Sequence, residues 1–193
     1  FIKSKNKRTS TTLKNKTKTN FNIVSIGVLN SNKNQLFILK ALKRLTKQFK
    51  VNFYGKVDAE YKKTLKKYIL KHKLESQVRF NEFVENNKIP EIFKDADVAV
   101  LASRNEGLPV TIMEAMACGV PILSSDSGGG ARYLLKTYKR ELIFNLDNAD
   151  DLKKKLENIK LMDKQKLKAL TDYNINTIKN NFSIEKEVLS YEK

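Results

Sequence analysis

The feature that most constrains the fold is a regular alternation of short apolar segments with longer amphipathic ones. Residues 22–28 (NIVSIGV) and 97–103 (DVAVLAS) are apolar runs of strand length, as is typical of strands buried on both faces. Residues 33–48 place leucines along one face of a predicted helix. A second predicted helix, residues 58–73, begins with Asp58, which can cap it. This alternation predicts an α/β fold, a Rossmann-like parallel sheet with helices on both faces. Further strands are expected at 50–55, 77–83 and 120–125, and further helices at 89–96, 109–119 and 150–159.

The chain is long enough for one ordinary domain, with 193 residues. Residues 1–20 contain seven Lys and Arg without one acid and show no hydrophobic periodicity, so we expect a basic linker or tail there. Residues 21–193 are expected to form a single domain whose two final helical segments, within 163–193, pack back onto it. The first residue is Phe1 and not Met, which favours a piece of a longer protein.

A net charge of +17 raises the alternative of a nucleic-acid-binding module. Lysines follow helix-like stretches such as residues 61–73 (YKKTLKKYILKHK), and this pattern favours solvated helix faces over a nucleic-acid groove. Association with an anionic membrane surface stays open. No apolar run reaches the roughly 18 residues of a membrane span, and the single cysteine, Cys118, cannot form an internal disulfide. We therefore expect a cytoplasmic protein, with or without peripheral contact with the inner face of a membrane.

Two loops are candidates for ligand binding, because ligands of parallel α/β sheets lie beyond the carboxyl ends of the strands. These loops are residues 27–33 (GVLNSNK) and 103–109 (SRNEGLP). The backbone N–H groups of residues 107–111 are expected to point out of the helix that follows, which makes an anion site. Lys33 would add a full positive charge. The two loops together suit a diphosphate.

Two acids, Glu106 and Glu114, flank the uncharged segment 107–113 (GLPVTIM). Each carboxylate can accept hydrogen bonds from two neighbouring hydroxyls. A nucleotide sugar presents such hydroxyl pairs on both sides of its diphosphate. The alternatives are a charge that stabilises a helix N-terminus for Glu106 and a solvated helix position for Glu114.

No other catalytic set competes with these residues. The one histidine, His72, lies in the lysine-rich segment, where we expect it to face solvent. No cluster of Cys, His or paired acids has the spacing of metal ligands, so no metal or cofactor is expected. Residues 127–131 (SGGGA) indicate a turn into the next helix or a backbone wall against a ligand.

The segment 106–126 (EGLPVTIMEAMACGVPILSSD) closely resembles the donor-site signature of the family 4 retaining glycosyltransferases, which use nucleotide sugars and have the two-domain GT-B fold. The likeness starts at residues 23–35 (IVSIGVLNSNKNQ), continues through 78–103 and ends at 180–193, so it covers nearly everything after Asn20. The resemblance implies the C-terminal, donor-binding half of such an enzyme, without its acceptor-binding N-terminal half.

The resemblance also implies roles for individual residues. Glu106 would contact the transferred sugar as the catalytic residue, either as a nucleophile or as an electrostatic support. Glu114 would bind the ribose, Lys33 would neutralise the leaving diphosphate, and Val84, next to Phe83, would border the base. The other donor-binding positions implied are Asn30, Arg104, Gly107, Leu108, Pro109 and Val110.

The expected function is retaining, metal-independent transfer of a hexosyl or N-acetylhexosaminyl group from a nucleoside diphosphate sugar to a glycan or lipid-linked acceptor, in surface polysaccharide or glycoconjugate synthesis. The acceptor would bind through the missing half, so the isolated chain would be inactive. Two positions depart from the family pattern: Val28 replaces an arginine and Tyr133 a glutamate. They favour the alternative, a truncated or divergent copy that binds nucleotide or nucleotide sugar without transfer.

Overall fold

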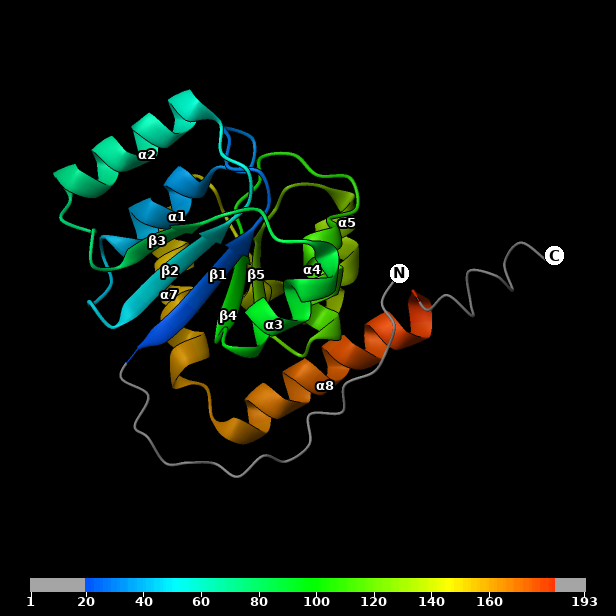
Figure 1. Ribbon diagram of the computed structural model, residues 1–193. Coiled ribbons are helices and arrows are strands. Elements are labelled where there is room, and N and C mark those ends of the chain that lie inside the picture. The colour runs from blue at the N-terminus through cyan, green and yellow to red at the C-terminus, as the bar shows by residue number, and fades with distance from the viewer. Residues whose placement is uncertain (1–19, 183–193) are drawn as a thin grey trace.

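Six parallel strands form one sheet in the order β3-β2-β1-β4-β5-β6 (Figure 1). The computed structural model describes residues 20–182, so nearly all of the expected basic tail and the stretch 183–193 lie outside the described residues. The strands are β1 (Phe21–Ile26), β2 (Phe49–Tyr54), β3 (Val78–Asn81), β4 (Val98–Leu101), β5 (Ile122–Ser125) and β6 (Ile143–Phe144). The predicted Rossmann-like parallel sheet is therefore confirmed.

Helices cover both faces of the sheet (Figure 1). On one face lie α1 (Gln35–Leu42), α2 (Ala59–Lys71) and α7 (Ala149–Leu161), and on the other α3 (Ile89–Lys94), α4 (Val110–Ala117) and α8 (Lys164–Asn181). Short helical turns complete the chain: η1 (Asn86–Lys88), α5 (Gly129–Leu134), η2 (Lys136–Tyr138) and α6 (Lys139–Leu142). No helix within residues 20–182 is long and apolar enough to cross a membrane.

The burial of the strands explains their sequence patterns. Every residue of β4 and β5 is buried, as continuous apolar runs between two helical layers should be. Nearer the edge, β2 alternates buried and half-buried residues, and Phe53 is fully buried within it. Phe37, packed on the ring of Phe144 at 5.7 Å between ring centres, helps to fix α1 against the sheet.

One helical prediction needs correction. Helix α1 ends at Leu42 and not at residue 48. Tight turns follow, in which Leu45 N–H donates to the Leu42 carbonyl at 2.9 Å, because the chain must reverse to begin β2 at Phe49. After residue 163 the structure describes one helix, α8, which Asp163 caps by accepting a hydrogen bond from Lys166 N–H at 2.8 Å. The rest of the span 163–193, for which two helical segments are expected, lies outside the described residues.

Candidate functional site

The two candidate loops meet at the carboxyl edge of the sheet. They do so because β1 and β4 are neighbours, with Ile23 opposite Val98 and Val24 opposite Ala99. The loop after β1 is bound directly to the loop after β4: Arg104 N–H donates to the Asn32 carbonyl at 2.8 Å. This is the point where the strand order reverses, which is where open α/β sheets bind ligands.

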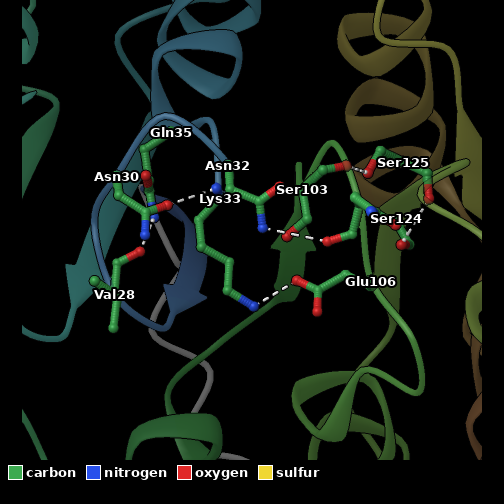
Figure 2. A network of polar contacts seen from close by, with 10 residues as sticks. Val28, Asn30, Asn32, Lys33, Gln35, Ser103, Glu106, Ser124 and Ser125 are labelled. Atoms are coloured by element: carbon green, nitrogen blue, oxygen red, sulfur yellow. Dashed lines mark hydrogen bonds and ion pairs between the residues drawn. The ribbon is translucent and has the colours of Figure 1, made fainter.

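Lys33 and Glu106 form an ion pair across the two loops, between Nζ and Oε1 (Figure 2). The pair is largely shielded from water, since the exposed fractions of the two side chains are 26% and 14%. The sequence placed both residues at the site but did not predict that they contact each other. The structure therefore holds one positive and one negative charge together where the loops join.

The loop after β1 is held in shape by its own polar side chains (Figure 2). Asn30 Oδ1 accepts a hydrogen bond from Lys33 N–H at 2.9 Å, so this oxygen shapes the loop. Gln35, only 2% exposed, donates from Nε2 to the Val28 carbonyl at 3.2 Å. The side chain of Val28 is 47% exposed and brings no charge where the family pattern has an arginine.

Helix α4 begins without a side-chain cap, so its first N–H groups are left for a ligand or water. Pro109 precedes the helix and has no N–H, so the expected donor run of residues 107–111 is interrupted there. The remaining backbone donors are Gly107, Leu108, Val110 and Thr111; none of their N–H groups has an acceptor within the described residues. Leu108 and Val110 are 48% and 58% exposed, which keeps this end of the helix accessible.

The glycine run after β5, residues 128–130, packs against the backbone of the Glu106 loop, a role that the sequence did not predict. Glu106 N–H donates to the Ser127 carbonyl at 2.9 Å. A Cβ atom on Gly130 would lie 2.0 Å from the Gly107 carbonyl oxygen, and one on Gly128 would lie 2.7 Å from the Glu106 carbonyl oxygen. The run is a backbone wall, but it supports the binding loop itself. The three glycines in SGGGA were the only signal in the sequence.

Buried serines lie beside this loop, and Figure 2 shows three of them, Ser103, Ser124 and Ser125. Ser125 Oγ donates to the Ser103 carbonyl at 2.6 Å, and the hydroxyls of Ser103 and Ser127 have no partner among the described residues. Buried hydroxyls without partners oppose folding. The protein interior next to the Glu106 loop is therefore polar, a feature that the sequence did not predict.

Glu114 lies in the second turn of α4 and is half-buried. No hydrogen-bond donor or cation within residues 20–182 contacts its carboxylate. Burial raises the pKa of this carboxyl group above the ordinary value of 4.5. The interpretation as a fully solvated helix position is therefore wrong. The residue is a desolvated acid that a pair of ligand hydroxyls could satisfy.

No hydrogen bond or ion pair within the described residues joins the side chains of Val84, Arg104 or Tyr133 to the Lys33–Glu106 pair. Val84, with the 59% exposed Phe83, follows the edge strand β3, two strands away from β1. The side chain of Arg104 is exposed, and within the described residues no carboxylate pairs with it. Tyr133 packs its ring on Phe182, with 6.3 Å between ring centres.

His72 is partly covered, contrary to the expectation that it faces solvent. Its ring lies 4.3 Å from that of Tyr68, measured between centres.

Across residues 20–182, no three His, Cys, Asp or Glu side chains gather as metal ligands would.

Substitution of the glycine wall gives a direct test of its role. Gly130→Ala should lower the free energy of unfolding by about 1–3 kcal/mol, because its methyl group would overlap backbone that cannot yield cheaply. The matched control is Gly129→Ala, whose methyl group meets no atom within 4 Å and should leave stability unchanged or raise it by about 0.4–1 kcal/mol. Urea unfolding measures both, and equal stability of the two variants would contradict the contact.

The raised pKa of Glu114 predicts that the difference in unfolding free energy between the unaltered chain and Glu114→Gln depends on pH. Between pH 4.5 and the raised pKa, the folded state binds a proton that the unfolded state has lost, so the unfolding free energy falls as pH rises. Glu114→Gln removes this loss and should be the more stable protein at pH 7, with the advantage shrinking toward pH 5. Thermal unfolding at several pH values measures it. The exposed Glu75→Gln controls for the loss of one negative charge, and an equal gain there would refute the burial argument.

Comparisons with known proteins agree with this geometry. The sequence profile of the glycosyl transferases group 1 matches residues 6–177. A Campylobacter jejuni α-1,4-N-acetyl-D-galactosaminyltransferase that acts on a diphospho-undecaprenol substrate is 34% identical over 137 residues, 70% of this chain and 37% of that protein. An uncharacterized glycosyltransferase of Methanocaldococcus jannaschii is 31% identical over 121 residues, 61% of this chain and 29% of that protein.

Solved structures share the fold. Sucrose-phosphate synthase from Thermosynechococcus elongatus superposes with a TM-score of 0.81 at 19% identity, over 91% of this chain and 44% of that one. Anabaena HepE in complex with UDP and glucose gives 0.73 at 23% identity, over 89% and 49%. The chain thus spans less than half the length of each of these relatives. The expected GT-B glycosyltransferase fold is confirmed, and the chain belongs to the glycosyl transferases group 1.

Proposed function

We propose that this chain binds the nucleoside diphosphate sugar of a retaining, metal-independent glycosyltransferase of family 4. The observation that carries the proposal is the pairing of Lys33 with Glu106 beside the uncapped start of α4. A cation, exposed backbone donors and a carboxylate meet at one sheet edge. A sugar diphosphate needs these three kinds of group.

The diphosphate would lie between Lys33 and the N–H groups of Gly107, Leu108 and Val110. These groups are fixed before the reaction by the loop hydrogen bonds, so they can stabilise the charge that develops on the leaving diphosphate. In other enzymes, the loss of one such preorganised donor costs about 3–4 kcal/mol of barrier. Lys33 supplies the charge that a metal ion supplies in metal-dependent enzymes, so no cofactor is invoked.

Glu106 would serve the transferred sugar. When the diphosphate forms an ion pair with Lys33, the carboxylate of Glu106 loses its partner. It can then accept hydrogen bonds from sugar hydroxyls or face the reacting carbon. Binding of the donor thereby exchanges one ion pair for another. The same exchange suits Glu106 as a nucleophile and as an electrostatic support.

Glu114 would hold the ribose hydroxyls, since its half-buried carboxylate has no other partner in the described part of the chain. Val84 and Phe83 would border the base. We favour uridine, because HepE was crystallised with UDP and a 33% identical Escherichia coli relative is named for UDP-Gal. Asn30 and Arg104 would shape the rim of the site.

The acceptor would be a glycan or a lipid-linked sugar of surface glycoconjugate synthesis. The names of two relatives support this choice, since both act on sugars attached to diphospho-undecaprenol and transfer galactosyl or N-acetylgalactosaminyl groups. Because the chain covers only 37% of the Campylobacter jejuni relative, we expect no transfer by the 193 residues alone.

A second candidate function is binding of nucleotide sugar without transfer. It is favoured by Val28, whose exposed apolar side chain leaves the phosphate site with one cation where the family pattern has two. It is also favoured by Tyr133, which packs on Phe182. In a chain extended by an acceptor-binding half, measurable turnover that Glu106→Gln lowers at least about a hundredfold would exclude this alternative.

The donor site is tested by calorimetric titration of the chain with UDP and with UDP sugars. Lys33→Gln should weaken UDP binding about ten- to a hundredfold, because a charged partner of the diphosphate is lost, whereas Lys40→Gln, on an exposed part of α1, should not. Glu114→Gln should weaken UDP and UDP sugar by a similar factor, since both contain the ribose.

The Glu106→Gln variant distinguishes the role of Glu106 from that of Glu114. It should bind UDP at least as well as the unaltered chain, because it releases Lys33 from its partner. Equal losses of UDP affinity in Glu106→Gln and Glu114→Gln would sink the assignment of separate roles.

A further inference from the structure

The net positive charge of the chain comes from its first 73 residues. Residues 1–73 contain twenty Lys and Arg and two acids, a net charge of +18, whereas residues 74–193 contain eighteen and nineteen, a net charge of −1. Within the described part, residues 43–73 hold eleven of these cations and both acids. Most lysines of α2 are exposed, which agrees with the solvated helix faces expected from the sequence, but the charge is concentrated in the first part of the chain.

Four of these lysines lie on the outer side of α2. The inner side of this helix buries Leu65 and Ile69 against the core. The opposite side presents Leu70, whose side chain is 63% exposed, among lysines spaced to lie around it on a helix surface. We call these residues the basic face: Lys63, Lys66, Lys67, Leu70 and Lys71, all of them exposed.

Acidic neighbours do little to neutralise the basic face. Glu60 pairs with Lys63 at 2.7 Å, but none of the other three lysines is paired with a carboxylate among residues 20–182. The pKa of His72, next to the basic face, is lowered first by partial burial and then by the positive charges of Lys43 and Lys71.

The basic face lies away from the donor site. Helix α2 starts after the carboxyl end of β2 and runs back along the sheet (Figure 1). Its last turn, which contains Leu70, therefore lies toward the amino ends of the strands, whereas Lys33 and Glu106 follow carboxyl ends. A large partner could therefore contact the basic face while the donor site remains open.

We propose that the basic face docks the chain on a bilayer surface rich in anionic phospholipid. Lysines suit such a surface, because a compact charge needs no fixed geometry to meet headgroup phosphates, and each is expected to raise affinity about fivefold, or about 1 kcal/mol. Leu70 enters the headgroup layer and leaves water. A nucleic acid fits less well, since the face has no arginine for bidentate contacts and would leave Leu70 exposed.

The test is co-sedimentation of the 193-residue chain with vesicles of phosphatidylcholine containing about 30% phosphatidylglycerol at about 0.15 M salt. Lys66→Gln combined with Lys67→Gln should weaken binding about 10- to 30-fold. Lys164→Gln combined with Lys179→Gln is the matched control, because it removes the same charge from exposed positions on α8, across the sheet. We expect less than about a twofold loss there. Residues 1–20 are unaltered in all variants, so their contribution cancels.

A second pair of variants tests the leucine. Leu70→Ser should weaken vesicle binding about three- to tenfold, whereas Leu161→Ser, at an 80% exposed position on α7, should have no effect. All four positions altered on α2 and α7 are exposed, so urea unfolding should show unchanged stability. Equal losses in the matched pairs, equal binding to pure phosphatidylcholine, or tighter binding to duplex DNA than to vesicles at the same salt would each overturn the proposal.

Discussion

The site depends on one structural constraint, the parallel pairing of β1 with β4. The two strands are separated by about 75 residues of sequence yet end at the same edge of the sheet, with Ile23 opposite Val98. Their loops are then joined by the hydrogen bond from Arg104 to Asn32 and by the ion pair of Lys33 with Glu106. Without this pairing, the cation, the carboxylate and the start of α4 would not meet.

The ion pair connects stability with function. Two charges that are mostly shielded from water stabilise each other, and each would be costly if left alone. A diphosphate that binds Lys33 must therefore replace the attraction of Glu106, and the freed carboxylate must find new partners in the sugar. Glu114 is half-buried without a partner, and the hydroxyls of Ser103 and Ser127 are unsatisfied among the described residues. Such groups oppose folding.

Local patterns in the sequence predicted the sheet and most of the helices, because apolar runs, caps and loop residues act over short distances. The contacts that shape the site were not predictable, since they join distant segments. Lys33 meets Glu106 across 73 positions, and Gly130 packs on the backbone of Gly107. Asn30 was predicted to bind donor, but its Oδ1 holds the backbone of Lys33. The end of α1 at Leu42 likewise follows from the need to begin β2.

The measurement that tests the donor site most directly is a two-dimensional amide NMR titration of the chain with UDP, which reports every backbone N–H separately. Our account predicts that the largest changes in amide chemical shift occur at Gly107, Leu108, Val110 and the loop 27–34. The amide chemical shifts of the basic face on α2 should not change. Shifts confined to α2, with the amides of 107–111 unchanged at saturating UDP, would contradict it.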